Sequence, residues 1–215
     1  MHYNWNIFET ITQGELSELQ WLLDTDSTLA LARDHNGVSV LMTALYYRKP
    51  DMVQLLRSLV PELDIFEAAA LGDTQALQQF LESGADVAAR SSDGFTLLHL
   101  AAFFNQPAIA RLLLDNGAEV NAVAGNSSRV CPLHSAVACG AVEIVKLLLE
   151  NGADANAGQQ GGWTALQAAA RHGNQEMVDL LLQHGADPEQ AADDGQTAIS
   201  MAANDTIRQH LQSHI

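Results

Sequence analysis

Four copies of one short motif recur along this chain at nearly constant spacing. Each copy is Gly-Ala followed by an acidic residue, and successive copies lie 33, 35 and 33 residues apart: Gly84-Ala85-Asp86, Gly117-Ala118-Glu119, Gly152-Ala153-Asp154 and Gly185-Ala186-Asp187. A period near 33 residues is typical of solenoids, in which equivalent units stack in a row and contact mainly their neighbours. The spacing therefore predicts an elongated stack with an extended surface of equivalent positions.

The residues between these motifs repeat in the same register. A segment with a Leu-His or Leu-Gln pair and small residues recurs at 94–102, 131–136 and 162–169, with a shortened form at 194–203. Three consecutive leucines precede the motif at 112–114, 147–149 and 180–182. These residues resemble the ankyrin repeat, whose signature opens with Gly-x-Thr-Pro-Leu-His-x-Ala-Ala and closes with Leu-Leu-Leu-x-x-Gly-Ala-Asp. The resemblance is strong from about Glu62 onward and degenerate before it.

The resemblance implies an all-α ankyrin-repeat solenoid of about seven stacked helix-turn-helix units, with short hairpin-like loops between them. We expect one domain over residues 1–215. It divides into an N-terminal capping repeat (1–35), a truncated repeat (36–60), four repeats (61–90, 91–125, 126–159 and 160–192) and a C-terminal capping repeat (193–215). The second repeat is short because about nine residues of the period are missing between Arg57 and Leu63.

The charge of the chain limits its partners. With 26 acidic and 10 basic residues, the formal net charge is −16. Nucleic-acid backbones and anionic membranes need clustered Lys and Arg, so we expect neither as a partner. The same charge would favour a protein with a basic surface, or it serves only to keep the chain dispersed in solution.

The sequence also favours a reducing compartment. No apolar run approaches the ~18 residues of a membrane span, and no basic segment followed by an apolar stretch marks a signal peptide at the N-terminus. Cys131 and Cys139 fall near opposite ends of one expected helix, roughly 12 Å apart, which is too far for a disulfide. We therefore expect free thiols and a cytoplasmic protein.

Several residues could in principle carry chemistry. His99 and His134 occupy the Leu-His position of the repeat, where the resemblance implies a structural ring that bonds to backbone between repeats. His210 and His214 have zinc-compatible spacing but no third ligand, and Cys131 replaces the usual Thr at a helix start. No phosphate-binding loop or nucleophile elbow is present. We assign no catalytic residue, metal or cofactor, and we expect no enzyme.

The resemblance places a binding surface on the first helices and the hairpin tips, which line the concave side in this family. In this frame, the two residues after each Ala-Ala pair and the residue after each turn glycine face the groove. The predicted partner-binding residues are Tyr46, Tyr47, Leu71, Phe95, Phe103, Phe104, Trp163, Arg171 and His172. Such aromatic anchors with a polar surround are typical of interaction sites.

Alternatives remain for parts of this surface. The rings could instead pack sideways between adjacent first helices, above all Tyr46 and Tyr47 beside the truncated repeat. Glu9 and Glu67 would add acidic contacts to a basic partner, and the longer loop 125–129 would reach out toward it.

The sequence predicts protein–protein recognition through the concave aromatic groove. With no other domain in view, we expect a stand-alone adaptor, inhibitor or assembly factor that is a monomer or a weak homodimer. One alternative is a self-associating structural protein that buries the aromatic patch in its own dimer. The other is a small-ligand binder or enzyme that uses histidines and Cys139 of the groove.

Overall fold

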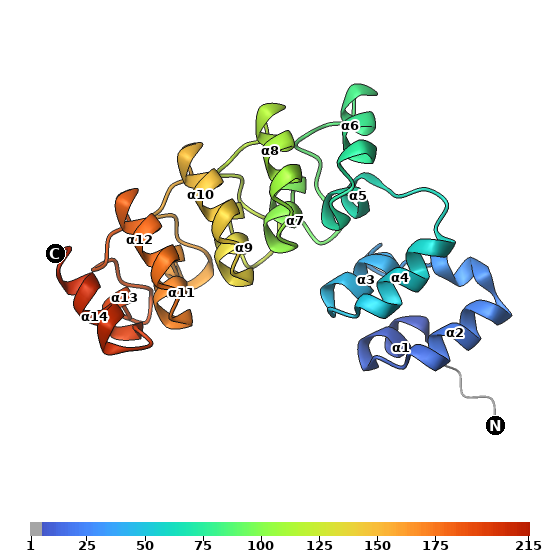
Figure 1. Cartoon of the computed structure of the whole chain (residues 1–215), viewed down its shortest axis with the longest axis horizontal. Coiled ribbons are helices and arrows are strands. Elements are labelled where there is room, and N and C mark those ends of the chain that lie inside the picture. Colours follow the sequence, from blue (N-terminus) through green and yellow to red (C-terminus); the bar gives the residue numbers. More distant parts are fainter. Residues whose placement is uncertain (1–5) are drawn as a thin grey trace.

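The computed structural model describes residues 6–215, which form a single row of paired helices (Figure 1). Among these residues there are fourteen α-helices and no sheet, so the predicted all-α solenoid is confirmed. The first helices of successive pairs are α1 (Ile7–Gln13), α3 (Val40–Tyr46), α5 (Ile65–Leu71), α7 (Leu97–Phe103), α9 (Pro132–Cys139), α11 (Ala165–His172) and α13 (Ala198–Met201). The second helices are α2 (Leu16–Thr25), α4 (Pro50–Leu59), α6 (Thr74–Glu82), α8 (Pro107–Asp115), α10 (Val142–Glu150), α12 (Gln175–Gln183) and α14 (Asp205–Gln212).

Every first helix except α9 begins at a polar residue whose side chain caps it. The side-chain oxygen of Thr96 accepts a hydrogen bond from the His99 backbone N–H, and Thr164 and Ser39 cap α11 and α3 in the same way. Such caps satisfy N–H groups that have no partner inside the helix. Two second helices, α4 and α8, begin at proline, which has no N–H to satisfy. Two short 3-10 helices cover Ser27–Leu31 and Gln160–Gly162.

The core is a strip of buried alanine and leucine side chains along the row. One cluster joins α5 through α14, and a second joins α1 through α5. The clusters meet on α5, where Ala68 packs toward the N-terminal helices and Ala69 toward the following ones. Because small residues let first helices approach closely, each unit buries its apolar face against its neighbours. Among residues 6–215, no helix combines the length and apolar character that crossing a membrane requires.

The short second unit keeps both of its helices and lacks only a hairpin. Helix α4 ends at Leu59 and α5 begins at Ile65, so a short connection replaces the Gly-Ala-Asp loop. At this point the helices change direction, and α1–α4 run across the view while α5–α12 run up it (Figure 1). A cavity of about 640 Å³, lined partly by Leu31, Leu63 and Phe80, lies at this junction. Arg33 and Asp64 form an ion pair of 2.7 Å across it.

Candidate binding groove

The first helices present a row of equivalent positions on one side of the solenoid. Counted from the capping residue, the same position is Tyr46 in α3, Leu71 in α5, Phe103 in α7, Ala138 in α9 and Arg171 in α11. The next position holds Tyr47, Phe104, Cys139 and His172. The row therefore passes from aromatic side chains through an alanine to two basic or titratable ones.

Tyr46, Phe103 and Phe104 form one aromatic cluster. The Tyr46 ring centroid lies 6.1 Å from that of Phe103 and 5.3 Å from that of Phe104, and the two phenylalanines pack edge to face at 5.1 Å. These separations fall within the range of favourable aromatic pairs. All three rings are half-buried, so they are both packed together and accessible from the groove.

The cluster borders an apolar cavity of about 340 Å³, the groove cavity, between α7 and α9. Tyr46, Phe95 and Phe103 form one side, and Ser135 and the exposed Ala138 of α9 lie across from them. Its remaining lining residues are His99, Leu100, Ser128, Val130, His134 and Gln159. The cavity lies where the row of large side chains is interrupted by Ala138. A small apolar cavity of this kind suits a bulky side chain of a partner.

The two histidines at the back of the cavity are structural, as predicted. In His99, Nδ1 accepts a hydrogen bond from the Thr96 backbone N–H at 3.3 Å, and Nε2–H donates to the Val130 carbonyl at 2.9 Å. In His134, Nδ1 accepts from the Cys131 N–H at 3.1 Å and Nε2–H donates to the Ala157 carbonyl at 3.0 Å. Each ring thus links its own helix start to the next hairpin.

Burial holds these groups in their neutral forms. It lowers the pKa of His99 to about 4, and it lowers the pKa of His134 below its usual range. Burial also raises the pKa of the Cys131 thiol and that of the Cys139 thiol. Both cysteines are free thiols. Neutral, fully bonded histidines and protonated thiols are poorly suited to acid–base or nucleophilic chemistry.

The C-terminal histidine pair has partners within the protein. His210 Nε2 lies 2.8 Å from Asp179 Oδ1, and His214 Nδ1 donates to the His210 carbonyl. Over residues 6–215, no group of three His, Cys, Asp or Glu side chains is arranged to hold a metal ion.

The predicted site residues divide into three groups. Tyr46, Phe95 and Phe103 line the groove cavity, and Phe104 packs behind them. Tyr47, Arg171 and His172 are exposed on the same row. Leu71 packs instead against the N-terminal core cluster, and Trp163 lies one unit beyond Val130 with its ring against the backbone of Gly161. The aromatic patch is therefore more compact than the sequence indicated.

Two further expectations are wrong. Glu67 is 4% exposed, with one carboxylate oxygen accepting from the Asp64 N–H at 2.9 Å and the other from the Ser39 hydroxyl at 2.6 Å. It holds the position that His99 holds in α7, which is buried, and its side chain therefore cannot reach a partner. The loop 125–129 does not extend outward either, because it is hydrogen-bonded to both neighbouring hairpins. The Gly125 N–H donates to the Gly94 carbonyl at 2.8 Å, and the Ser128 carbonyl accepts from the Gln160 N–H at 2.9 Å.

Sequence reasoning missed the residues that make the cavity concave. Val130, Ser128 and Gln159 come from hairpin segments whose lengths vary between repeats. Only Ala138 could have indicated the cavity from the sequence, because it places a small side chain where the neighbouring units have large ones.

Two family models match the chain. One, described as ankyrin repeats in three copies, covers residues 65–159, and the other, a single ankyrin repeat, covers residues 161–193. Together these spans take in every helix from α5 to α12.

Curated relatives are similar over parts of the chain. A putative ankyrin repeat-containing protein of Treponema pallidum is 31% identical over 123 residues, which is 53% of this chain and 41% of that protein. Palmitoyltransferase AKR1 of Gibberella zeae is 40% identical over 67 residues, or 31% of this chain and 9% of that protein. SH3 and multiple ankyrin repeat domains protein 2 of Homo sapiens is 41% identical over 54 residues, or 25% and 3%. The matched region thus spans less than half the length of each of these relatives.

Proposed function

The chain belongs to the ankyrin-repeat family, and on that premise we propose that it recognises another protein through the concave face that carries the groove cavity. Ankyrin repeats are generally protein–protein interaction modules. They are typically non-catalytic, and the similarity to palmitoyltransferases is confined to the ankyrin region, so no enzyme activity carries over.

One observation carries the proposal: an accessible cluster of three aromatic rings borders an apolar cavity on the concave side. Tyr47 is 53% exposed beside it, and Phe103 and Ala138 face the same space. Apolar cavities rimmed by aromatic side chains account for much of the binding energy in protein interfaces. Because the groove is built on helices with capped ends and a continuous core, little ordering entropy is lost when a partner binds.

The role that follows is that of an adaptor, an inhibitor or an assembly factor. A solenoid face of this kind acts by occupying or aligning surfaces of its partner. A partner with a basic surface, which the net charge favours, would meet acidic side chains chiefly on the second helices and hairpins, such as Glu143, Glu150 and Asp154, and not in the groove.

Self-association is the competing function. The exposed aromatic rings would then be covered by a second copy of the chain, and the protein would dimerise without any other partner. Light scattering of the purified protein over a hundredfold concentration range separates these possibilities. If the protein is still a monomer at the highest concentration, the groove is not covered by a second copy of the chain.

The test of the proposed function is affinity capture from source-cell lysate with three proteins. Ala138→Trp fills the groove cavity from an exposed position whose equivalents already carry Tyr46 and Phe103. Ala108→Trp makes the same change at an exposed position on α8, on the outer helix layer, and serves as the control. We expect a partner retained by the wild type and by Ala108→Trp to be lost by Ala138→Trp. Equal retention by all three folded proteins would contradict a groove interface.

A further inference from the structure

The charges of this protein are unevenly distributed between its two helix layers. Helices α3, α7, α9 and α11 contain no aspartate or glutamate, although the chain has 26 acidic residues. The second helices α6, α8, α10 and α12 all carry acidic residues. The concave face is thus free of acidic helix residues along its central part, in a protein of strongly negative net charge.

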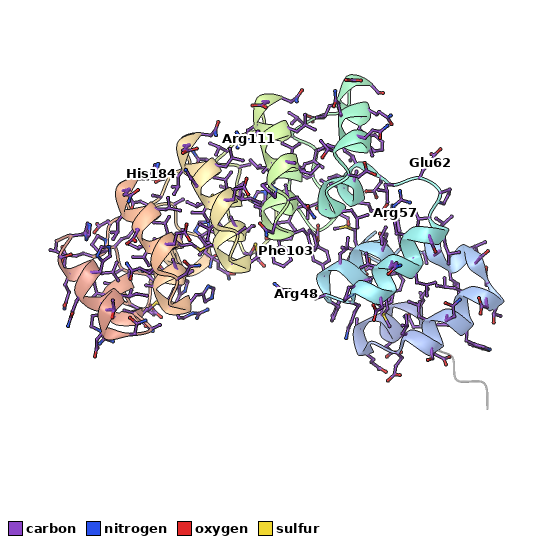
Figure 2. The ribbon with its side chains drawn as sticks, in the orientation of Figure 1. Arg48, Arg57, Glu62, Phe103, Arg111 and His184 are labelled. Carbon is purple, nitrogen blue, oxygen red and sulfur yellow. The ribbon has the colours of Figure 1, made fainter. Side chains whose placement is uncertain are left out.

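Three arginines lie next to residues that line the groove cavity, although none of them lines the cavity itself. Arg48 lines a depression of about 210 Å³ together with Phe103, Phe104 and Cys139. Figure 2 shows Arg48 and Phe103 on the same side of the row, whereas Arg111 lies on the opposite side. Arg129 stands between Ser128 and Val130, which both line the groove cavity. Arg171 holds the position on α11 that Ala138 holds on α9, one helix spacing of about 8–10 Å further along.

These three arginines have no acidic partner of their own. Arg48, Arg129 and Arg171 are exposed, and none of them takes part in an ion pair within residues 6–215. Asp93, which is bonded to the cavity residue Tyr46, is already engaged by the hydroxyl groups of Tyr46 and Ser91. The neighbourhood of the cavity therefore carries three exposed arginines that form no ion pair with residues 6–215.

We infer that the groove takes a segment of a partner protein in which a bulky apolar side chain is flanked by aspartate or glutamate. This inference rests on the proposed function and specifies its partner. The apolar side chain enters the groove cavity between Phe103 and Ala138. The flanking carboxylates lie against the guanidinium groups of Arg48, Arg129 or Arg171, which bind carboxylates in a planar, two-pronged geometry.

A random library of twelve-residue peptides displayed on phage is the probe. It is selected on the immobilised wild type after depletion on Ala138→Trp, and the enriched sequences are read. We expect enrichment of peptides with an aromatic or long aliphatic residue close to Asp or Glu. Fluorescent copies of the enriched peptides then give affinities by polarisation at low and high salt, because exposed charge pairs weaken as salt is added.

Charge reversal on the protein gives the sharper readout. Arg171→Glu should weaken the acidic peptide about tenfold at low salt, and should strengthen a copy of the peptide with its acids replaced by lysine. Arg111→Glu, the same change on the outer face of α8, is the control and should alter neither affinity. Equal urea unfolding midpoints ensure that folded proteins are compared.

The outcomes separate the inference from the function it rests on. The inference would be overturned if the enriched peptides had basic flanks. It would also be overturned if none of Arg171→Glu, Arg48→Gly and Arg129→Glu changed the affinity for acidic peptides. Either outcome would leave binding in the groove standing. Enrichment that Phe103→Ala and a second cavity-filling variant, Ala138→Leu, do not diminish would overturn both. A library that yields no peptide preferring the wild type over Ala138→Trp would also count against both.

Discussion

The hydroxyl group of Tyr46 donates a hydrogen bond of 2.8 Å to Oδ2 of Asp93, across 47 positions of sequence. Tyr46 ends α3 and Asp93 lies in the loop before α7, so the bond passes over the unit formed by α5 and α6. It forms because Ala70 of α5 is small and buried, in one cluster with Met42 and Leu100, and leaves room for the Tyr46 ring. Burial and Asp93 together raise the pKa of Tyr46 far above its usual range.

This bond is predicted to tie the N-terminal helices to the repeats that carry the groove. Tyr46→Phe removes the donor and should lower the free energy of unfolding by about 1–2 kcal/mol, because the half-buried carboxylate loses one partner. The measurement is a double-mutant cycle with Asp93→Ala, using urea unfolding. We expect a coupling energy of about 1 kcal/mol.

Tyr47→Phe is the matched control, since Tyr47 follows Tyr46 directly and is exposed. It should leave the unfolding midpoint unchanged. A coupling energy indistinguishable from zero between Tyr46 and Asp93 would mean that water replaces the bond without cost.

The ring of His99 is predicted to be replaceable by an amide but not by a methyl group. In α11 the same position is Gln167, whose Oε1 accepts from the Thr164 N–H at 2.8 Å and whose Nε2 donates to the Gln190 and Gln196 carbonyls at 2.9 Å. His99→Gln should therefore cost less than about 1 kcal/mol, whereas His99→Ala should cost about 2–4 kcal/mol by leaving buried groups unpaired. Urea unfolding at pH 7 measures both.

The complementary change tests whether this bonding pattern is general along the row. Gln167→His should retain most of the stability, and Gln167→Ala should lose it. If His99→Gln proves as costly as His99→Ala, the shape of the ring matters more than its hydrogen bonds.

Stability is predicted to fall on mild acidification because of His99. Its folded-state pKa of about 4 lies below the ordinary value of 6.5, so the unfolded chain binds the proton more readily between these values. The stabilisation is fully present above pH 6.5, is lost as pH falls toward 4, and changes no further below that. His134, whose pKa is also lowered, acts in the same direction.

The expected size is about 2 kcal/mol of unfolding free energy lost between pH 7 and pH 5 through His99 alone. Urea unfolding of the wild type and of His99→Gln at both values isolates it, because carboxylate titrations are common to the two proteins. Identical losses in the two proteins would show that His99 is not the titrating group.

The sequence predicted the repeat, the structural histidines and much of the aromatic row, because each depends on a pattern that recurs within one unit. The Leu-His pairs of His99 and His134 recur in register with the helix starts, so their role could be inferred locally. Tyr46 and Phe103 fell on equivalent positions and Phe104 on the next one, so their placement on one face followed from the period.

Contacts between units could not be predicted in the same way. Glu67 was misplaced because Gly72 follows the capping residue of its helix by eight positions, whereas Gly140 and Gly173 follow theirs by nine. Alignment on the glycine therefore shifted its frame by one residue. The carboxylate of Glu67 can only accept hydrogen bonds, so it accepts one from the Ser39 hydroxyl of the preceding unit. A histidine at this position donates instead to a carbonyl of the following hairpin, as His99 does. The Tyr46–Asp93 bond depends on the size of Ala70 in a third unit, a condition that no single repeat reveals.

Arg48 is predicted to hold a strained backbone conformation at the edge of the groove. Its φ is +52°, in the left-handed region that most units occupy with glycine, as at Gly140 with φ +79°. Arg48→Gly should therefore raise the free energy of unfolding by about 1 kcal/mol. The matched reverse change is Gly140→Ala, whose added Cβ would meet no atom within 4 Å and should cost about 1 kcal/mol through conformation alone. Thermal and urea unfolding of both variants measure these effects. If Arg48→Gly destabilises the protein, the arginine side chain stabilises this turn by more than its backbone strain costs, and its position beside Phe103 owes more to folding than to binding.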